Sequence, residues 1–582
     1  MDKELKGQGL SRRSFLSGAA IAGASAAAFG LSACGAQPET KPTDNADTKP
    51  ATETAKGNSN QTANTQNGGG KPSFFTAPEA IPEKDIKETK ETDVLVIGAG
   101  YSGLAAALSS QENGLNVIIA EKTKQINGRG AGTGVVNSKF AQSMGATVDD
   151  IPAAVFRWNQ TCGNRTNESL VDLFMTKSGE AMDWLLEHSE KYGVEIDLWD
   201  GYSRNPLLPD EPGYHMINFA QNGKGVADFD VSKFPTTEIL GKEVQEAGVE
   251  ILYESPAVQL VKDGDAIVGA ILKTAEGYTK VTAKKGVVLA TGDIAGDEEM
   301  VDYYCPQAKN AAPIYSPVGA NTGDGHKMGL WVGAAMQDRM FPPMLHPQRY
   351  CDKASNQMQG PFMFVNEKGK RFFNEGTWVQ AKSLQIMNNT KDAVAYVVYD
   401  QNWPEELLDS LPHGGGMFWD SFRFKGKSDY ASTVEYYKKS VEETIETKIT
   451  VKADTLEELA EGIGVPVDEF LKTVKRYNEL CAKGIDEDFN KNPQFMYPID
   501  KPPYYASKVG ACLLAIVGGL KVDTNLQCMN EAGEPIQGLY AVGNVSGDAY
   551  AIDYPINVPG NSHGRCLTWG YWVGKVLSGQ TN

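Results

Sequence analysis

The stretch that decides the fold is residues 91–122, which read ETDVLVIGAGYSGLAAALSSQENGLNVIIAEK. It opens with a short, β-branched apolar run at residues 94–97, which is typical of a buried parallel strand. The glycine-rich turn GAGYSG follows at residues 98–103, and the alanine-rich residues 104–110 favour a helix. A second apolar run occupies residues 117–120. The pattern therefore predicts a βαβ unit that binds a dinucleotide.

Each glycine of that turn has a physical role in holding the dinucleotide. Gly98 permits the tight turn, Gly100 lets the backbone approach a pyrophosphate, and Gly103 lets the helix pack against the strand. We expect the pyrophosphate at the helix N-terminus, where unpaired N–H groups and the helix dipole favour an anion. The carboxylate of Glu121 is placed to accept hydrogen bonds from an adenosine ribose. The motif alone does not distinguish FAD from NAD, and it leaves the reaction open.

Composition excludes some classes of partner. The chain has 582 residues, which is long enough for two or three domains and a large core. It carries 55 basic and 74 acidic residues, and a net charge of -19 argues against a nucleic-acid partner. Its eight cysteines include no CxxC pair and no CxxCH haem attachment sequence. The sequence therefore predicts no metal site and no covalent haem.

The N-terminal segment, residues 1–34, resembles an export signal rather than part of the fold. Residues 11–16, SRRSFL, resemble a twin-arginine signal, and Cys34 ends an LSAC sequence like that of bacterial lipoproteins. A lipid on Cys34 would hold the protein at the outer face of the membrane, or in the periplasm near it. The alternative is a cleaved signal with an incidental cysteine. Residues 35–88 are poor in large apolar side chains, and we expect them to form a flexible tether.

Several motifs, in the order in which they occur, resemble the flavoprotein subunit of fumarate reductase and its soluble flavocytochrome relatives. They are ATG at 290–292, NTGDG at 321–325, HP at 346–347, VNEKGKRFFNE at 365–375, ADTLEELA at 453–460 and GLYAVGN at 538–544. The resemblance covers about residues 90–582. It implies an α/β protein with a discontinuous, Rossmann-like FAD-binding domain at 89–335 and 500–582. It further implies an α+β capping domain at 336–499 that closes over the flavin.

The same resemblance implies which residues contact FAD. Besides Gly98, Ala99, Gly100 and Gly103 of the opening turn, these are Ser102, Glu121, Arg129, Gly130, Thr133, Gly134, Val258, Asp324, Asn544, Ser562 and His563. Asn544 departs from the family's usual glutamate. Its amide can still form hydrogen bonds with a ribitol or ribose.

The residues that bind and protonate a dicarboxylate in fumarate reductases are not matched here. Val379 stands where the proton-donating arginine is expected, and Asn557 stands where the clamping arginine is expected. Leu513 and Leu514 stand where a carboxylate-binding histidine pair is expected. Desolvating a dicarboxylate without cationic partners costs on the order of several kcal/mol per charge. The sequence therefore predicts a substrate less polar than fumarate.

The C-terminal sequence carries a second resemblance. The segments DYP at 553–555, PG at 559–560 and LTWGY at 567–571 are similar to the end of 3-ketosteroid dehydrogenases. The resemblance implies that the Tyr554 hydroxyl and the Gly560 N–H hold the ketone oxygen of a substrate. Residues 556–558 are additional in this chain and change the spacing between the two donors.

The chemistry expected of such a site is reduction of an activated alkene. A reduced flavin transfers a hydride to the β-carbon, and each fixed donor at the developing enolate oxygen lowers the barrier by roughly 3 to 4 kcal/mol. A positioned acid then protonates the α-carbon. The candidates for that acid are Tyr554, Tyr550, Tyr350, His346 and Arg371, of which Arg371 also has Glu375 as a structural partner four residues on.

Together these observations predict an exported, lipid-anchored FAD enzyme that reduces the C=C bond of an α,β-unsaturated carbonyl compound. A steroid-like enone and a phenylpropenoid are the natural substrate classes. Because the chain lacks a haem motif, its electrons are expected from an extracytoplasmic donor, a cytochrome or a flavin-carrying protein. Two alternatives remain: a dehydrogenase that runs in the oxidative direction, and a flavin- or ligand-binding lipoprotein without turnover.

Overall fold

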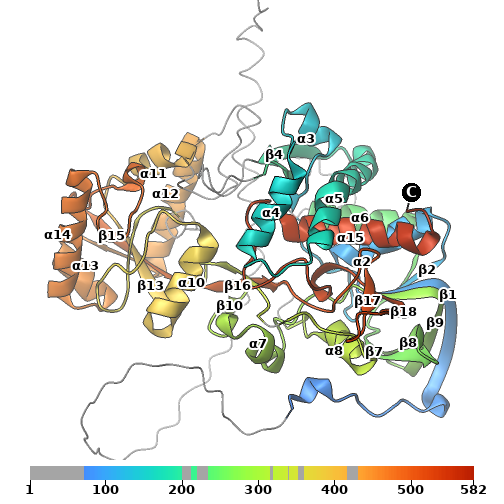
Figure 1. Cartoon of the computed structure of the whole chain (residues 1–582). Helices are drawn as coiled ribbons and strands as arrows, with labels where there is room; N and C mark the ends of the chain where they lie inside the picture. The colour runs from blue at the N-terminus through green and yellow to red at the C-terminus, as the bar shows by residue number, and fades with distance from the viewer. Residues whose placement is uncertain are drawn as a thin grey trace, which may run out of the picture.

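The computed structural model describes residues 71–130, 132–199, 211–218, 234–314, 319–338, 340–350, 360–413, 415 and 430–581. The predicted export signal, Cys34 and most of the predicted tether lie outside these residues. The described residues form two lobes, with the first and last parts of the chain together in one lobe (Figure 1). In the described part of the chain, no helix combines the length and apolarity needed to cross a membrane.

The larger lobe is built on an eight-stranded sheet. Its parallel core has the strand order β18-β9-β1-β2-β6, with β17 antiparallel to β18 at one edge and the antiparallel pair β7-β8 joined to β9. The strands are β1 (Ile86–Ile97), β2 (Val117–Ala120), β6 (Glu250–Leu252), β7 (Ala257–Asp263), β8 (Ala266–Thr274), β9 (Gly277–Leu289), β17 (Gln527–Met529) and β18 (Pro535–Ala541). The C-terminal strands therefore complete a sheet that the N-terminal strands begin.

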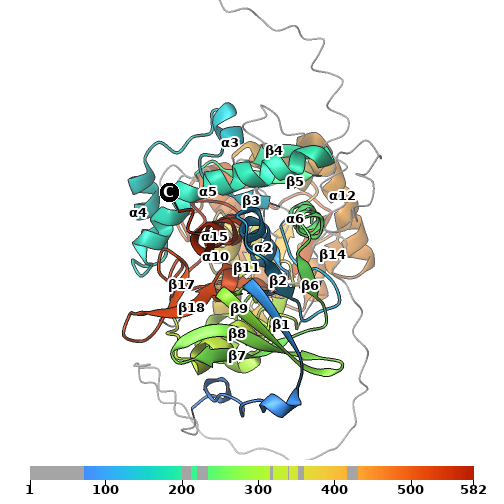
Figure 2. The same cartoon turned by 90° about the vertical axis from the view of Figure 1, so that its right-hand side faces the viewer.

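Helices cover one face of this sheet (Figure 2). They are α2 (Tyr101–Glu112), α4 (Ile151–Thr161), α5 (Glu168–Ser189), α6 (Pro235–Glu246) and α15 (Asn561–Ser578). Residues 101–110 of α2 are all buried, because α2 packs against both the sheet and α15. Small side chains in α2 therefore serve close packing as well as helix propensity.

The predicted βαβ unit is present. β1 pairs in parallel with β2, with Val94 opposite Val117 and Ile97 opposite Ala120, and α2 connects the two strands. Residues 94–97 and 117–120 are buried, as expected for strands covered on both faces.

The smaller lobe surrounds a four-stranded antiparallel sheet of order β12-β13-β15-β14. The strands are β12 (Met363–Val365), β13 (Val394–Tyr399), β14 (Thr450–Ala453) and β15 (Tyr504–Gly510). One apolar cluster packs this sheet against α10 (Val379–Asn389), α11 (Trp403–Ser410) and α12 (Tyr430–Glu446). A second cluster packs it against α13 (Leu456–Ile463) and α14 (Val467–Lys483).

Two short sheets complete the fold. The sheet β10-β16-β11 consists of β10 (Ala312–Pro313), β11 (Pro343–His346) and β16 (Cys512–Ile516), and it lies between the lobes (Figure 1). The sheet β3-β5-β4 consists of β3 (Gly132–Gly134), β4 (Glu195–Trp199) and β5 (Tyr214–Asn218). The remaining short helices are α3 (Lys139–Ser143), α7 (Glu298–Tyr304) and α8 (Asp324–Trp331).

The end of the predicted tether is a point of difference. Residues 71–88, which the sequence analysis includes in the tether, already form ordered structure, and β1 begins at Ile86. Phe74 is buried among Tyr303, Tyr304 and Phe341. The Trp331 indole also donates a hydrogen bond of 2.9 Å to the Phe74 carbonyl. One aromatic anchor is enough to fix a polar segment that lacks a core of its own.

Candidate functional site

The carboxyl ends of the central parallel strands define one edge of the large sheet, and most of the predicted cofactor residues lie there. The turn 98–103 follows β1, Glu121 follows β2, and Asn544 follows β18. The Ser102 side chain lies against Gly543, where an added Cβ would come within 2.4 Å of the Ser102 hydroxyl. Ligands of open parallel sheets bind at this edge.

The glycines of the opening turn are required by their surroundings. Gly98 has a φ of +109°, and a Cβ at that position would lie 2.4 Å from the Ala290 carbonyl oxygen. A Cβ at Gly103 would lie 1.9 Å from the Gly98 carbonyl oxygen. Gly100 is the N-cap of α2, and because glycine has no side chain, the backbone there is open to an approaching phosphate. The structural roles predicted for the first and third glycines are therefore confirmed.

Glu121 is buried and anchored to the turn. Its carboxylate accepts the Ala99 N–H and the Thr123 N–H, each at 2.8 Å. A carboxylate has about four acceptor positions, so it retains capacity for ribose hydroxyl groups. Val258 lies near the start of β7, which the 2.9 Å bond from the Ser255 N–H to the Glu121 carbonyl holds at the same edge.

Asp324 is paired with Lys122. The Asp324 carboxylate lies 2.9 Å from the Lys122 ammonium, and Asp324 is the first residue of α8. This salt bridge joins the end of β2 to the NTGDG motif, so both lie beside Glu121.

The glycine-rich run after Glu121 crosses to the C-terminal helix. Gly134 donates a hydrogen bond of 2.9 Å to the Gly560 carbonyl, and the Gly132 carbonyl lies 2.7 Å from His563 Nδ1. The Thr133 and Tyr101 hydroxyl groups are 3.0 Å apart.

Two further predicted contacts in this run are held from other segments. The Gly130 carbonyl accepts a hydrogen bond from the Thr236 hydroxyl, and the Arg129 guanidinium donates to the Ile314 carbonyl. The structure thus brings residues 132–134 and 560–563 together, while Arg129 and Gly130 are bonded to Ile314 and Thr236.

Tyr554 lies at the N-terminus of α15. Its hydroxyl oxygen accepts the Ser562 N–H at 3.0 Å, and its ring stacks on Tyr550 with centroids 5.8 Å apart. The Tyr550 hydroxyl donates to Asn561 at 2.8 Å. Burial raises the pKa of both phenols, so both remain protonated at neutral pH. Gly560, the N-cap of α15, has a φ of +73°.

His346 ends β11 and is buried. Burial, reinforced by the charge of Arg129, lowers the pKa of His346 to about 4, so the imidazole is neutral at neutral pH. The carbonyl of Pro343, on the same strand, accepts a 2.7 Å hydrogen bond from the Gln380 amide, which also contacts the Asp553 carboxylate at 2.6 Å. Gln380 and Asp553 were not predicted from the sequence, because nothing local to either residue indicates that α10 meets the segment before Tyr554.

Arg371 and Tyr350 occupy other surroundings. Arg371 is buried in the smaller lobe, where its guanidinium donates to Glu375 at 2.7 Å and to Asp486 at 2.8 Å. Tyr350 lies beneath the Lys508 ammonium, which is 4.4 Å from the ring centroid. The catalytic role predicted for these two residues stays a prediction. The ion pairs of Arg371 give this residue a structural role.

The residues predicted to stand in place of the dicarboxylate ligands are mostly apolar; Leu514 is half-buried and the others are buried. Val379 begins α10 and Leu513 lies in β16, opposite Leu345. Asn557 is also buried and donates a long hydrogen bond of 3.5 Å to the Ala154 carbonyl.

Some of the unmet hydrogen-bonding capacity belongs to residues near the predicted cofactor and substrate positions. Among the described residues, buried polar atoms without a hydrogen-bond partner include Arg129 Nε, Thr291 Oγ1, His346 Nδ1, Asn557 Oδ1 and Arg565 Nε. Such atoms are costly unless a ligand or water pairs with them. An extended cofactor that carries a pyrophosphate, hydroxyl groups and ring nitrogens would fit these donors and acceptors.

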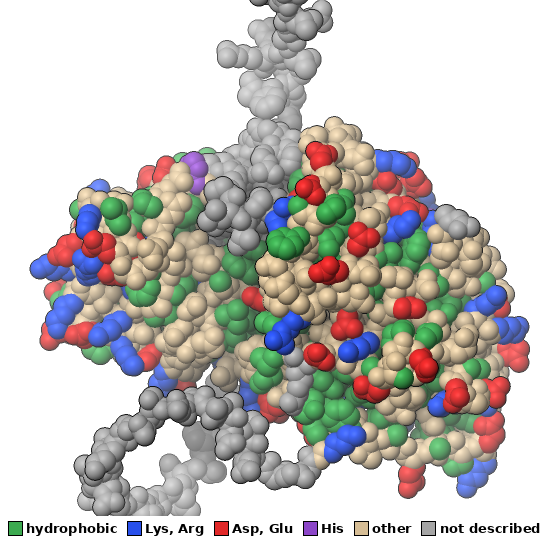
Figure 3. Space-filling view, in the orientation of Figure 1, with side chains coloured by type: hydrophobic (Ala, Val, Ile, Leu, Met, Phe, Trp, Pro, Cys, Tyr) green, Lys and Arg blue, Asp and Glu red, His purple; other side chains and the backbone are tan. Residues whose placement is uncertain are grey.

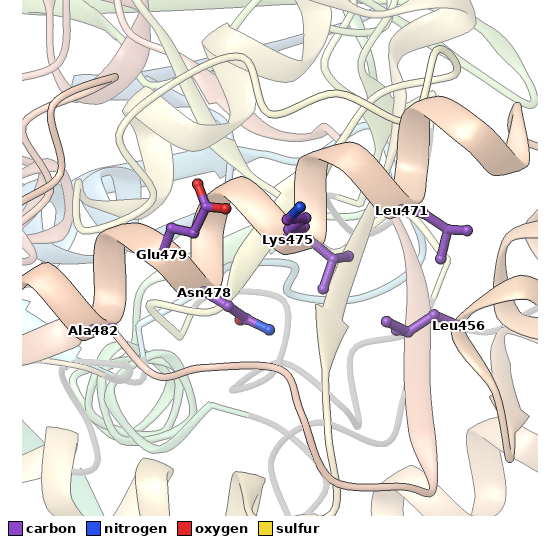
Figure 4. Close-up of a pocket in the computed structure, with 7 residues that line it drawn as sticks. Leu456, Leu471, Lys475, Asn478, Glu479 and Ala482 are labelled. Carbon is purple, nitrogen blue, oxygen red and sulfur yellow. The ribbon is translucent and has the colours of Figure 1, made fainter.

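Other surface features of the described residues are a mixed distribution of charge and a shallow hollow. Acidic and basic side chains are interspersed over the face shown in Figure 3, without a basic stripe on that face. A shallow hollow on α14 in the smaller lobe is lined mainly by Leu456, Leu471, Lys475, Asn478, Glu479 and Ala482 (Figure 4). Among the described residues, no group of three or more His, Cys, Asp or Glu side chains could hold a metal ion.

The fold and the site define a dinucleotide-binding flavoprotein. Residues 93–555 match the family described as FAD binding domain, and the chain belongs to that family. Its cofactor is FAD, and it is an oxidoreductase of the group that contains fumarate reductases and 3-oxosteroid dehydrogenases, as the motifs predict.

Three similar proteins illustrate the range of this group. Vinyl phenol reductase of Lactiplantibacillus plantarum is 25% identical over 513 residues, with 83% of this chain and 94% of the relative covered. The 3-oxosteroid 1-dehydrogenase of Mycolicibacterium smegmatis is 26% identical over 581 residues, with coverage of 83% and 96%. The solved structure of the open conformation of a flavocytochrome c3 fumarate reductase superposes on this chain with a TM-score of 0.62. The two sequences are 24% identical, and the superposition covers 88% of this chain and 83% of that chain. The last comparison shows likeness of fold.

Proposed function

We propose that this protein reduces the C=C bond of a neutral or monoanionic α,β-unsaturated carbonyl compound, of the steroid-like enone or phenylpropenoid type. Two observations together carry the proposal. The protonated Tyr554 phenol lies at the start of α15, and the buried side chains Val379 and Leu513 stand where cationic side chains would bind a dicarboxylate. The names of two relatives, vinyl phenol reductase and 3-oxosteroid 1-dehydrogenase, agree with a substrate of this polarity.

We propose that the FAD domain is discontinuous and that the smaller lobe acts as its cap. The pairing of β18 with β9 supports the first part, because it joins residues after 500 to the N-terminal sheet. The contacts of Gln380 with Pro343 and Asp553 support the second part, because they place α10 beside the segment that carries Tyr554. Closure of such a cap would exclude water from the reacting groups.

Reduced FAD, when bound, supplies the hydride that adds to the β-carbon of the substrate. The protein's own contribution begins at the carbonyl oxygen, where negative charge develops. The Tyr554 oxygen accepts the Ser562 N–H, so the hydroxyl proton of Tyr554 is left to donate. Together with the Gly560 N–H, it would stabilise the developing enolate by roughly 3 to 4 kcal/mol per donor.

The α-carbon must then receive a proton, which completes a two-electron reduction of the double bond. His346 is poorly suited to supply it, because a pKa of about 4 leaves the ring without a surplus proton at neutral pH. Arg371 is held by two carboxylates. These observations favour the phenols Tyr554 and Tyr550 as the source, with solvent as the ultimate donor.

A direct test uses the FAD-loaded protein, reduced with dithionite under anaerobic conditions. We expect return of the yellow flavin absorbance on addition of a steroid enone or a phenylpropenoid carbonyl compound, and little change with fumarate. Rapid reoxidation by fumarate would contradict the assignment of substrate class. Reoxidation by none of the alkenes would favour the alternative of a flavin-binding protein without turnover.

The oxidative direction is a second candidate function, supported by the relative named 3-oxosteroid 1-dehydrogenase. Oxidised protein mixed with a saturated 3-ketosteroid and an acceptor dye distinguishes the two. Bleaching of the flavin by the saturated compound, faster than its reoxidation by the enone, would reverse the proposed direction.

We further propose export by the twin-arginine route, a lipid anchor on Cys34, and electron supply by an extracytoplasmic cytochrome or flavin-carrying protein. Sequence supports this: residues 11–16 and 31–34 carry the export and lipoprotein patterns, and both lie outside the described residues. Labelling cells with radioactive palmitate tests the anchor. Label should be present on the native chain and lost in Cys34→Ala, and equal labelling of both would refute the anchor.

A further inference from the structure

A buried carboxylate that the motifs did not predict lies at the cofactor edge. Asp293 follows β9 and is 1% exposed. One of its oxygens accepts the Ala295 N–H at 2.8 Å, and the other accepts the Ile516 N–H at 3.4 Å. The side chains of Asn544 and Asn321 lie near enough to it to lower its pKa and so favour its charged form.

The order of strands places Asp293 relative to the parts of FAD. Across the sheet, β2, β1, β9 and β18 are successive neighbours. Glu121 at the end of β2 marks the adenosine ribose, and the turn after β1 marks the pyrophosphate. The next group of FAD along its length is the ribityl chain, and the next strand end is that of β9, which carries Asp293. Asn544 follows on β18.

The chemistry around Asp293 matches a polyol. Hydroxyl groups need both donors and acceptors, and a carboxylate between two amides that can rotate supplies both. Beside it, the Thr291 hydroxyl is buried without a partner among the described residues. Arg129 is the cation that interacts electrostatically with the carboxylate, and its Nε is also buried without a partner there.

We propose that Asp293 is a cofactor-binding carboxylate that accepts hydrogen bonds from the ribityl hydroxyl groups of FAD. It thereby supplies, from the end of β9, the negative charge that Asn544 does not supply from the end of β18. Burial raises the pKa of Asp293 to about 6, opposed by its hydrogen bonds with Ala295 and Ile516, so it is ionised at pH 7.5.

The test is FAD affinity of the full chain, measured by quenching of FAD fluorescence as apoprotein is added at pH 7.5. Asp293→Asn keeps an oxygen for the Ala295 N–H but removes the charge. Hydrogen bonds to charged groups are worth enough to predict an increase of about 10- to 100-fold in Kd. The midpoint potential of the bound flavin should also rise, because a negative charge near the flavin opposes its reduction.

Asp400 provides a matched control. It is 1% exposed, follows β13, accepts the Asn402 N–H two residues on at 2.8 Å, and accepts the Asp500 and Lys501 N–H groups. It therefore has the same turn geometry as Asp293 in the other lobe. Asp400→Asn should lower the melting temperature of the apoprotein while Kd for FAD stays within about twofold of native.

A rescue experiment tests whether a carboxylate at position 544 can take over the role of the carboxylate at position 293. Asn544→Glu combined with Asp293→Ala should bind FAD at least about tenfold more tightly than Asp293→Ala alone. The Arg565 guanidinium already donates to the Asn544 side chain at 2.7 Å and would pair with the new carboxylate. Native affinity in Asp293→Asn, or parallel losses in Asp293→Asn and Asp400→Asn, would overturn the proposal. Absence of rescue would overturn the exchange. No arm uses a substrate, so these results are independent of the proposed reaction.

Discussion

Tyr554 shows how a buried side chain can hold its hydroxyl group in a fixed position. Its ring is supported by Tyr550, its oxygen is fixed by the Ser562 N–H, and burial keeps its proton in place. A hydroxyl fixed in this way is preorganised, which is the condition under which a donor stabilises a developing charge most strongly. The segment 553–560 that carries it differs in length from its counterpart in ketosteroid dehydrogenases, but Tyr554 and Gly560 both lie at the start of α15.

Tyr554→Phe should lower kcat for enone reduction by about 100-fold while FAD content stays near native, because the ring stack survives and only the donor is lost. Turnover and the flavin-to-protein ratio are the measurements. Tyr399→Phe, which removes a buried hydroxyl 2.8 Å from the Ser507 hydroxyl in the smaller lobe, is the matched control. A kcat equal to native in Tyr554→Phe would exclude a catalytic role for its hydroxyl.

Among the elements, the pair α2 and α15 is the most restrictive. A Cβ at Gly574 of α15 would lie 2.4 Å from the Ser109 hydroxyl and 2.7 Å from the Ser110 backbone nitrogen. Gly241 of α6 also lies in a helix, but a Cβ there meets only the tip of the Ile126 side chain, at 2.7 Å. Substitutions at the two glycines therefore compare a clash with fixed backbone atoms and a clash with a side chain that can move.

Gly574→Ala should destabilise the protein by about 1–3 kcal/mol, because neither helix can shift without moving the cofactor turn. Gly241→Ala should be nearly neutral, since Ile126 can rotate and alanine favours the helix by up to about 1 kcal/mol. Thermal denaturation of the two variants, with FAD content alongside, provides the comparison. Equal melting temperatures would contradict the assigned contact.

A buried ion cluster joins two segments of the smaller lobe. Arg371 bridges Glu375 and Asp486, and the Lys491 ammonium lies 3.6 Å from Glu375, with the side chains of all four at most 5% exposed. Because these carboxylates have no access to solvent, removal of the arginine leaves buried charge behind.

Arg371→Leu should therefore cost about 3–5 kcal/mol of stability. In protein that remains folded at low temperature, kcat should change little. Arg476→Ala, which breaks only exposed pairs with Glu487 and Asp488, should change stability by less than about 1 kcal/mol. Calorimetry and turnover measurements distinguish a structural from a catalytic role of Arg371. An unchanged melting transition together with lost turnover would indicate a catalytic role.

For the whole molecule, buried histidines determine the response to acid. Burial lowers the pKa to about 4 at each of His215, His326, His346 and His563. The unfolded value is about 6.5, so between pH 6.5 and 4 the unfolded chain binds more protons than the folded one. Asp293 and Glu406, with pKa values raised by burial to about 6 and about 8, act in the opposite direction. The raised pKa values of His188, Asp183, Asp548 and Asp553 also act in that opposite direction, but the large shifts of the four buried histidines dominate between pH 6.5 and 5.

The free energy of unfolding should thus fall as the pH is lowered from 6.5 to 5. Melting temperatures recorded over this range test the sign. His326→Gln can still donate to the Gly518 carbonyl but cannot take up a proton, so it should melt with a shallower pH dependence. A melting temperature that rises toward pH 5 would contradict this assignment of charge states.

The sequence by itself determined what depends on neighbouring residues. The β1–α2–β2 unit follows from a local apolar period and from glycines whose roles are local to one turn. The assignment of Val379, Leu513 and Asn557 to positions that are cationic in fumarate reductases also comes from the motifs around them, and it stays a prediction.

Only the tertiary structure decided which distant segments meet. The contact of Asp293 with Asn544, the bridge from Arg371 to Asp486, and the anchoring of Phe74 on α7 each join residues far apart in the chain. Periodicity and spacing carry no record of such contacts, because packing and the pairing of buried polar groups select them when the whole chain folds.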